Sequence, residues 1–149
     1  LELLAGADLG MLGGLGIGMP LTVSATYTDS VFDTATSGND FWSGATPGND
    51  FPYIPEWQFN ARLGFFFGQT NVFLNYQWVD EVYTSADNSN TIDSYGIFDL
   101  SVVHHWNEGL DLFGKVTNLT EEDYATPRLP AGYRAGAPRL YSLGVNYAF

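Results

Sequence analysis

The feature that constrains this chain most is a strict two-residue alternation between Arg139 and Phe149. One face of this segment carries bulky apolar and aromatic side chains, and the other carries small or polar ones. A period of two indicates a β-strand, because successive side chains of a strand point to opposite faces. A strand of a membrane-spanning barrel has this pattern, because its bulky apolar face meets hydrocarbon and its other face meets a wet or crowded interior. The bulky face consists of Tyr141, Leu143, Val145, Tyr147 and Phe149.

The same alternation recurs in six earlier segments, so the sequence predicts an all-β protein. It is strongest from Trp57 to Phe67, where Arg62 falls in the middle of the polar face. On a lipid-facing position near the bilayer midplane an arginine costs roughly 2–4 kcal/mol, which favours an inward orientation for Arg62. The predicted strands cover 1–9, 21–32, 57–67, 71–78, 97–106, 110–119 and 139–149.

The connections between these predicted strands alternate in length, as a barrel with short periplasmic turns and long extracellular loops requires. In the first connection five glycines argue against a helix and favour a flexible turn or a short bent strand. A sheet of seven strands leaves two unpaired edges, so we expect further strands from chain outside residues 1–149. The short connections are 10–20, 68–70 and 106–109, and the long polar ones are 33–51, 84–93 and 120–137.

Composition excludes several classes of protein. A net charge of −12 with five Lys and Arg residues argues against nucleic-acid partners. The absence of cysteine excludes disulfides, thiolate metal sites and Cys nucleophiles. No run of eighteen apolar residues occurs, which excludes a transmembrane helix.

No arrangement of residues in the sequence predicts catalysis. Neither a Ser-His-Asp pattern, nor a phosphate-binding glycine loop, nor paired catalytic carboxylates stand out, so we expect no enzyme and no cofactor. The acidic loop residues lack the spacing of a calcium loop. His104 and His105 are neighbours in a predicted strand and therefore face opposite sides, so they cannot together chelate one metal. No metal site is expected.

The C-terminal region carries a recognisable set of motifs. Asn118-Leu-Thr-Glu121 is followed by Tyr124 and by Gly136-Ala-Pro-Arg139, which leads into the alternating strand that ends in Phe149. This ending resembles that of TonB-dependent outer-membrane receptors, in which an Asn-Leu element, a Tyr and a Gly-x-Pro-Arg turn precede the last barrel strand. The usual Asn-Leu-Phe-Asp is Asn-Leu-Thr-Glu here. Within that family the chain is most similar to ferric citrate and siderophore receptors.

The resemblance implies an antiparallel up-and-down transmembrane β-barrel of about 22 strands. Residues 1–149 would supply its seven C-terminal strands, and the earlier strands and an N-terminal plug domain would lie outside this chain. The implied function is uptake of a ferric chelate, a siderophore or ferric citrate, by TonB-coupled transport across the bacterial outer membrane. The implied partners are the chelate, TonB through the plug, outer-membrane lipid and lipopolysaccharide, and the barrel assembly machinery through the C-terminal strand.

Three of the five basic residues fall in the last long loop and its junction with the final strand. Guanidinium groups bind carboxylates in a bidentate manner, so this cluster can bind an anionic iron chelate. For Arg139, next to Pro138, a structural role at the start of the strand is favoured, and the other two can equally pair with acidic residues at 121–123. The candidate ligand-binding residues are Arg128, Tyr133, Arg134 and Trp42.

Aromatic residues near the ends of the predicted strands are typical of membrane-interface girdles. For aromatic residues of the loops, carbohydrate stacking is an alternative role. The predicted interface aromatics are Trp57, Trp78, Trp106, Tyr147 and Phe149.

Two other classes of protein fit parts of the pattern. A soluble all-β carbohydrate-binding module would pack the aromatic faces of its strands into one dry core, whereas a membrane barrel would turn them outward. Another outer-membrane barrel, a porin or an adhesin, would share the strands but lack a plug. Alternation alone does not separate these classes, and the motifs at the C-terminal end favour the receptor.

Overall fold

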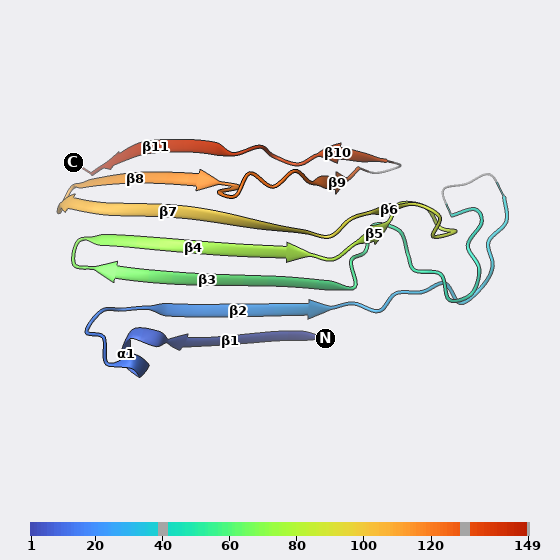
Figure 1. Ribbon diagram of the computed structural model, residues 1–149, viewed down its shortest axis with the longest axis horizontal. Coiled ribbons are helices and arrows are strands. Elements are labelled where there is room, and N and C mark those ends of the chain that lie inside the picture. Colours follow the sequence, from blue (N-terminus) through green and yellow to red (C-terminus); the bar gives the residue numbers. More distant parts are fainter. Residues whose placement is uncertain (39–41, 129–131, 149) are drawn as a thin grey trace.

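Seven long strands form one antiparallel sheet in the computed structural model, which describes residues 1–38, 42–128 and 132–148 (Figure 1). Each long strand pairs with the next long strand along the chain, so the topology is up-and-down. The predicted all-β class and the seven strands are confirmed, and β1 and β11 form the two edges of the sheet. The long strands are β1 (Glu2–Asp8), β2 (Pro20–Tyr27), β3 (Trp57–Phe67), β4 (Thr70–Val79), β7 (Tyr95–Asn107), β8 (Leu110–Thr117) and β11 (Leu140–Tyr147).

Smaller elements lie between the long strands. A five-residue helix, α1 (Leu9–Gly13), connects β1 to β2. Within the described residues no helix is long and apolar enough to cross a membrane. Two short hairpins occupy the long loops and consist of β5 (Val82–Tyr83) with β6 (Thr91–Ile92), and β9 (Ala125–Pro127) with β10 (Tyr133–Ala135).

Two details of the predicted elements are wrong. The first connection contains a helix despite its glycines, because Asp8 caps the N-terminus of α1 and Gly14 ends it with a φ of 62°. The second strand ends at Tyr27 and not near Phe32. Phe32 pairs within the loop that follows β2 and not with β3. Its amide donates to the carbonyl of Asn49 at 2.8 Å.

The strand registers assign the residues of the sheet to two faces. Leu63 lies opposite both Leu21 and Leu74, and Leu74 lies opposite Leu100, so the apolar positions of neighbouring strands form continuous rows. All charged side chains of the seven long strands lie on the other face, which we call the polar face. They are Glu2, Asp8, Arg62, Asp99, Asp111 and Lys115.

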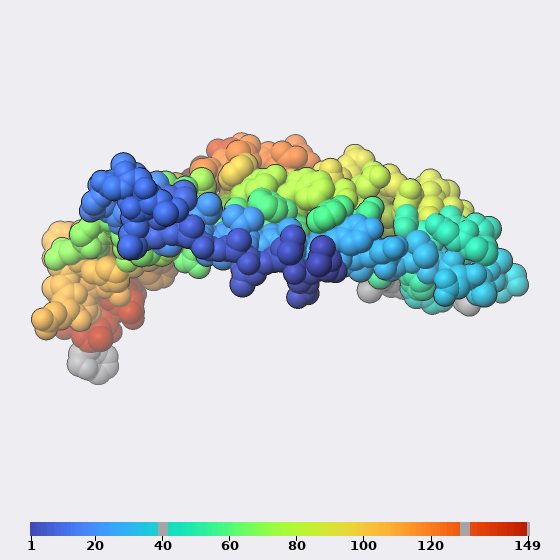
Figure 2. Space-filling view, turned by 90° about the horizontal axis from the view of Figure 1, so that it is seen from below, coloured from blue at the N-terminus to red at the C-terminus, as the bar shows by residue number. Residues whose placement is uncertain are grey.

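The sheet is a single layer, and Figure 2 shows it as a thin, bent slab. Among the described residues, the buried hydrophobic side chains all lie outside the long strands. On the apolar face Leu143, in the middle of β11, is 90% exposed. Because a sheet must bury an apolar face against something, this exposure predicts a covering that the described residues do not supply. The buried hydrophobic residues are Phe32, Ala45, Val82, Ala86 and Ile92.

Candidate ligand-binding site

Three long loops gather at one end of the sheet and the short turns lie at the other (Figure 1). We call these the loop end and the turn end. Loop A covers residues 28–56, loop B covers 80–94 and loop C covers 118–139. The three long polar connections predicted from sequence therefore all lie at the loop end of the sheet.

Loops A and B share a small hydrophobic core. The rings of Phe32 and Phe51 stack with their centroids 4.1 Å apart, and Trp42 packs edge-on against Phe32 at 6.0 Å. Ala45 of loop A and Ala86 of loop B are each 1% exposed and lie in the same cluster. The two loops therefore fold as one packed unit.

Asn88 of loop B ties this unit together through hydrogen bonds. Its Oδ1 accepts from the Asp50 amide at 2.8 Å and from Nδ2 of Asn49 at 3.0 Å, and its own Nδ2 donates to the Asp50 carbonyl at 3.0 Å. Asn88 has a φ of 56°, a conformation that asparagine tolerates better than most residues. The neighbouring Asp87 accepts hydrogen bonds from Ser85 and Ser89, which lower the pKa of its carboxyl group.

Asn118 organises the start of loop C. It is 1% exposed, has a φ of 50°, and its Oδ1 accepts from the Glu122 amide at 2.7 Å. Its Nδ2 donates to the carbonyls of Glu122 at 2.9 Å and Ala137 at 3.0 Å, and its amide donates to Asp99 at 3.0 Å. One side chain therefore joins the two ends of loop C. The Asn-Leu element of the sequence is thus a structural motif.

The segment Gly136 to Arg139 closes the same loop. The Gly136 amide donates to the Tyr124 carbonyl at 2.8 Å, and the Ala137 amide donates to the Tyr124 hydroxyl at 3.2 Å. Arg139 Nη2 lies 2.5 Å from Glu121 Oε2, and its hydrogen bond with Tyr141, together with the Glu121 charge, raises the pKa of Arg139. The structural role expected for Arg139 agrees with this pairing.

Glycine is needed at position 136 because of the Tyr124 ring. A Cβ on Gly136 would lie 2.3 Å from Cε1 and Cζ of that ring. We therefore expect Gly136→Ala to destabilise loop C by about 1–3 kcal/mol, as overpacking does elsewhere. Limited proteolysis would detect faster cleavage in loop C. Because Tyr124→Ala removes the clash, the double variant should be less sensitive than the sum of the two single effects, and an additive result would contradict this account.

The structure brings three of the four candidate ligand-binding residues together on the β9–β10 hairpin of loop C. Arg128 and Arg134 are exposed, and Nε of Arg134 lies 3.3 Å from Oγ1 of Thr126. Tyr133 is 69% exposed and lines a hollow of about 810 Å³ between this hairpin and β6. Trp42 instead belongs to the packed core of loop A, where it is 40% exposed.

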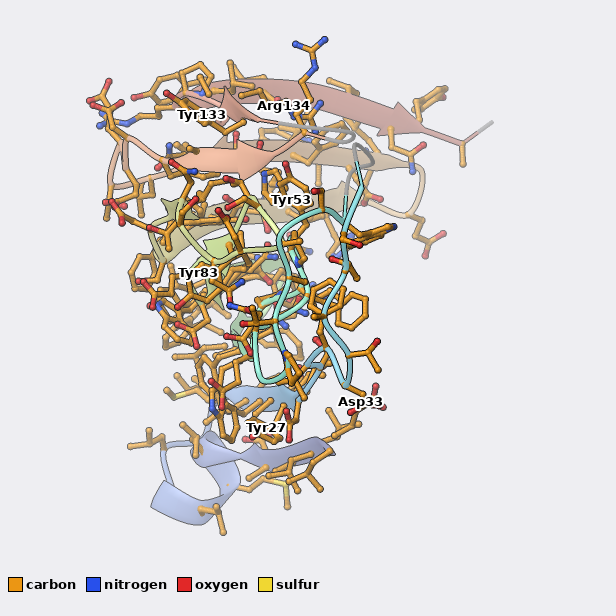
Figure 3. The ribbon with its side chains drawn as sticks, turned by 90° about the vertical axis from the view of Figure 1, so that its right-hand side faces the viewer. Tyr27, Asp33, Tyr53, Tyr83, Tyr133 and Arg134 are labelled. Atoms are coloured by element: carbon orange, nitrogen blue, oxygen red, sulfur yellow. The ribbon has the colours of Figure 1, made fainter. Side chains whose placement is uncertain are left out.

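Tyr53 connects loop A to both other loops. Its amide donates to the Tyr83 carbonyl at 2.8 Å, and its hydroxyl accepts from the Gly132 amide of loop C at 3.0 Å. Figure 3 shows Tyr53 on loop A between Tyr83 and the pair Tyr133 and Arg134. This contact is not predictable from local sequence, because Tyr53 has an unusual φ of 65° and its partner is 79 residues away.

A second hollow, of about 230 Å³, lies on the polar face of the sheet. The Arg62 guanidinium sits 4.2 Å from the centroid of the Phe73 ring, and Lys115 Nζ lies 3.1 Å from Asp99 Oδ2. This surface is suited to contact with a polar partner or solvent. Its lining side chains include Thr22, Ser24, Asn60, Arg62, Asn75 and Asp99.

The histidines bind neighbouring side chains on opposite faces. His104 Nδ1 lies 2.9 Å from Thr70 Oγ1, and His105 Nδ1 lies 2.7 Å from Asp111 Oδ1. Within the part of the chain that the structure describes, no group of three or more metal-binding side chains is arranged to hold an ion.

The predicted interface aromatics fall at both ends of the sheet. Trp57 packs against Tyr27 at the loop end, with ring centroids 4.8 Å apart, and Trp78 lies beside this pair on the same face. Trp106 and Tyr147 lie at the turn end and are 61% and 64% exposed. Phe149 lies outside the described residues. The roles of these aromatics at a membrane interface stay a prediction.

Comparison with solved structures supports the fold. The siderophore receptor PiuA from Acinetobacter baumannii superposes with a TM-score of 0.74 at 20% identity, covering 88% of this chain and 20% of that one. The ferric citrate transporter FecA in the unliganded form gives 0.75 at 19% identity, covering 97% and 23%. The ferric yersiniabactin uptake receptor FyuA from Yersinia pestis gives 0.73 at 15% identity, covering 99% and 23%.

This chain thus spans about a fifth of the length of each of these solved structures. No curated protein matches the sequence. The family model described as "TonB dependent receptor-like, beta-barrel" matches residues 1–119, which include six of the seven long strands. That family is one of transport receptors of the outer membrane and not of enzymes. The chain belongs to the TonB-dependent receptor β-barrel family.

Proposed function

We propose that this chain is the C-terminal barrel segment of a bacterial outer-membrane receptor that takes up a ferric chelate by TonB-coupled transport. The observation that carries the proposal is the separation of the sheet into two faces. One face is apolar and exposed, and the other holds every charged side chain of the seven long strands. The chain also belongs to this family. In this proposal residues 1–149 form one part of the barrel. The plug domain and the earlier strands come from chain outside these residues.

The chemistry of loop C supports an anionic chelate as the ligand. Arg128 and Arg134 are exposed on the β9–β10 hairpin, together with Tyr133. Tyr133 lines the 810 Å³ hollow, whereas the arginines lie outside its lining, which includes Asp93, Glu122 and Asp123. Two guanidinium groups on one short hairpin suit the carboxylates of ferric citrate or of a carboxylate siderophore. Three solved structures of similar fold are, by their own descriptions, a siderophore receptor, a ferric citrate transporter and a ferric yersiniabactin uptake receptor.

The packing of the loops supports a particular division of roles. Loops A and B share a core and the Asn88 hydrogen bonds. A hydrogen bond from the Gly132 amide to the Tyr53 hydroxyl joins this unit to the arginine hairpin. The ligand would bind between the packed unit of loops A and B and the side chains of loop C. Transfer across the membrane would need the plug and TonB.

The test is an uptake assay with the full-length receptor in a strain that lacks its own copy. We expect growth under iron starvation, and accumulation of radiolabelled iron, with at least one chelate from a panel of ferric citrate and ferric siderophores. Uptake should stop when TonB is deleted. Passive uptake independent of TonB would favour a porin, and carbohydrate binding by a soluble product would favour the soluble all-β carbohydrate-binding module.

Arg128→Gln and Arg134→Gln should each weaken binding of the transported chelate. Loss of one charge-assisted, bidentate contact costs about 1.5–3 kcal/mol, which raises Kd roughly tenfold or more. Isothermal titration of the purified receptor would measure this change. Arg→Lys at each position keeps the charge but loses the bidentate hydrogen bonding of the guanidinium group. Glu108→Gln at the turn end controls for the change in net charge. Unchanged affinity in both Gln variants would remove these residues from the site.

A further inference from the structure

The connection between β1 and β2 differs chemically from the other short turns. Residues 9–19 contain only Leu, Gly, Met and Ile, so the segment has no charged or polar side chain. Met11, Leu12 and Leu15 are 81%, 77% and 58% exposed. The two other short connections carry Gln69 and Glu108. An exposed connection without any polar side chain is not what a turn in water requires.

Hydrogen bonds and close backbone packing give this connection a defined structure. Asp8 Oδ1 accepts from the amides of Met11 and Met19, each at 3.1 Å, which fixes both arms of the turn. Position 10 admits no side chain, because a Cβ there would lie 1.8 Å from the Ile17 carbonyl oxygen. Gly14 ends α1 in the left-handed conformation. These contacts fix the backbone that carries the exposed side chains of Met11 and Leu12.

The turn continues the apolar face of the sheet. Leu21 pairs with Leu63 and Gly18 forms a bridge with Phe66, so the same register places Met19 opposite Phe65 on the apolar face. The Leu9 amide donates to the Met19 carbonyl at 2.9 Å, which extends the ladder by one more step. Figure 2 shows α1 standing out from the sheet, and in Figure 3 it lies beyond β1, away from loop A.

We propose that α1 and its flanking residues form a lipid anchor, in which Met11, Leu12 and Leu15 insert into the periplasmic leaflet of the outer membrane beside the barrel. This inference rests on the proposed membrane placement of the sheet, whose turn end then faces the periplasm. Lipid acyl chains match a surface that is continuous with the apolar face and offers no side-chain hydrogen bond. A protein partner would be expected to meet a polar rim, which residues 9–19 lack.

The test places a spin label at Leu12→Cys in the full-length receptor, reconstituted in vesicles of phosphatidylethanolamine and phosphatidylglycerol. Residues 1–149 contain no cysteine, and any cysteine elsewhere is replaced by serine. Power saturation then compares collisions of the label with oxygen, which concentrates in lipid, and with a water-soluble nickel chelate. Leu74→Cys on the apolar face is the lipid control, and Glu108→Cys in another short turn is the water control.

The proposal expects the ratio of oxygen to nickel accessibility at Leu12 to match that at Leu74 and to exceed that at Glu108. Accessibility to nickel as high as at Glu108 would place α1 in water and overturn the anchor. Low accessibility to both reagents would show α1 packed against protein and would overturn it as well. If Leu74 itself faces water, the membrane placement fails and the anchor fails with it, whereas a lipid-exposed Leu74 with a water-exposed Leu12 rejects the anchor alone.

Discussion

Asn118→Ala is expected to open loop C and to lower the stability of the barrel by about 2–4 kcal/mol. The substitution removes three side-chain hydrogen bonds, to the Glu122 amide and to the carbonyls of Glu122 and Ala137. The Glu122 amide and the carbonyls of Glu122 and Ala137 would lose their partner. Asn118, the residue that supplies it, is 1% exposed. Alanine also tolerates a φ of 50° less well than asparagine does.

Urea unfolding of the full-length receptor in detergent, together with protease cleavage in loop C, would measure the effect. Asn118→Gly is the matched control, because glycine accepts the positive φ but still loses the hydrogen bonds. We expect Asn118→Gly to be destabilised by less than Asn118→Ala but by more than about 1 kcal/mol, since the lost hydrogen bonds are common to both. Wild-type stability in Asn118→Gly would show that the side chain has no part in closing loop C.

The sheet could be predicted from sequence because its two determinants are local. Alternation with a period of two assigns each side chain to a face, and the chain order of an up-and-down sheet assigns its neighbours. Leu63, Leu74 and Leu100 fall in one row by this reasoning, and the registers confirm it. Arg62 shares the polar face with Asn75, as the alternation predicts, and the inward orientation of that face stays a prediction.

The loops could not be predicted to the same depth, because their structure depends on contacts distant in sequence. Asn88 binds Asp50 across 38 residues, and Tyr53 binds Gly132 across 79. Both residues adopt a positive φ that only the assembled loop stabilises. Trp42 is an example: sequence places this aromatic residue only in a long polar loop, and the structure shows its ring packed against Phe32 and Phe51. Its role in ligand binding stays a prediction.

The helix in the first connection illustrates a different limit. Five glycines between 10 and 18 give low intrinsic helix propensity, which argues against a helix. α1 is only five residues long, so caps at its two ends outweigh propensity. Asp8 supplies one cap from within β1, where the sequence pattern marks it only as a polar strand residue.

Leu74→Arg should be the most damaging single substitution on the apolar face. Leu74 lies midway along β4, opposite Leu63 and Leu100. In the proposed barrel its side chain would meet lipid near the middle of the membrane. An arginine at such a depth costs about 2–4 kcal/mol because its charge leaves water for hydrocarbon. Folding of the full-length receptor into phospholipid vesicles, followed by urea titration, would measure the loss of folding free energy.

Asn75→Arg provides the matched control one residue away. Asn75 pairs with Arg62 and Asp99 on the polar face, where water and the Asp99 carboxylate are available to a new guanidinium. We expect a loss below about 1 kcal/mol there, because a solvated charge is cheap and one neighbour is acidic. The reverse order, with Leu74→Arg tolerated and Asn75→Arg destabilising, would mean that the apolar face does not meet lipid. Equal large losses at both positions would instead indicate a sheet buried on both sides, so the difference between these two neighbouring variants tests directly which face of the sheet the membrane covers.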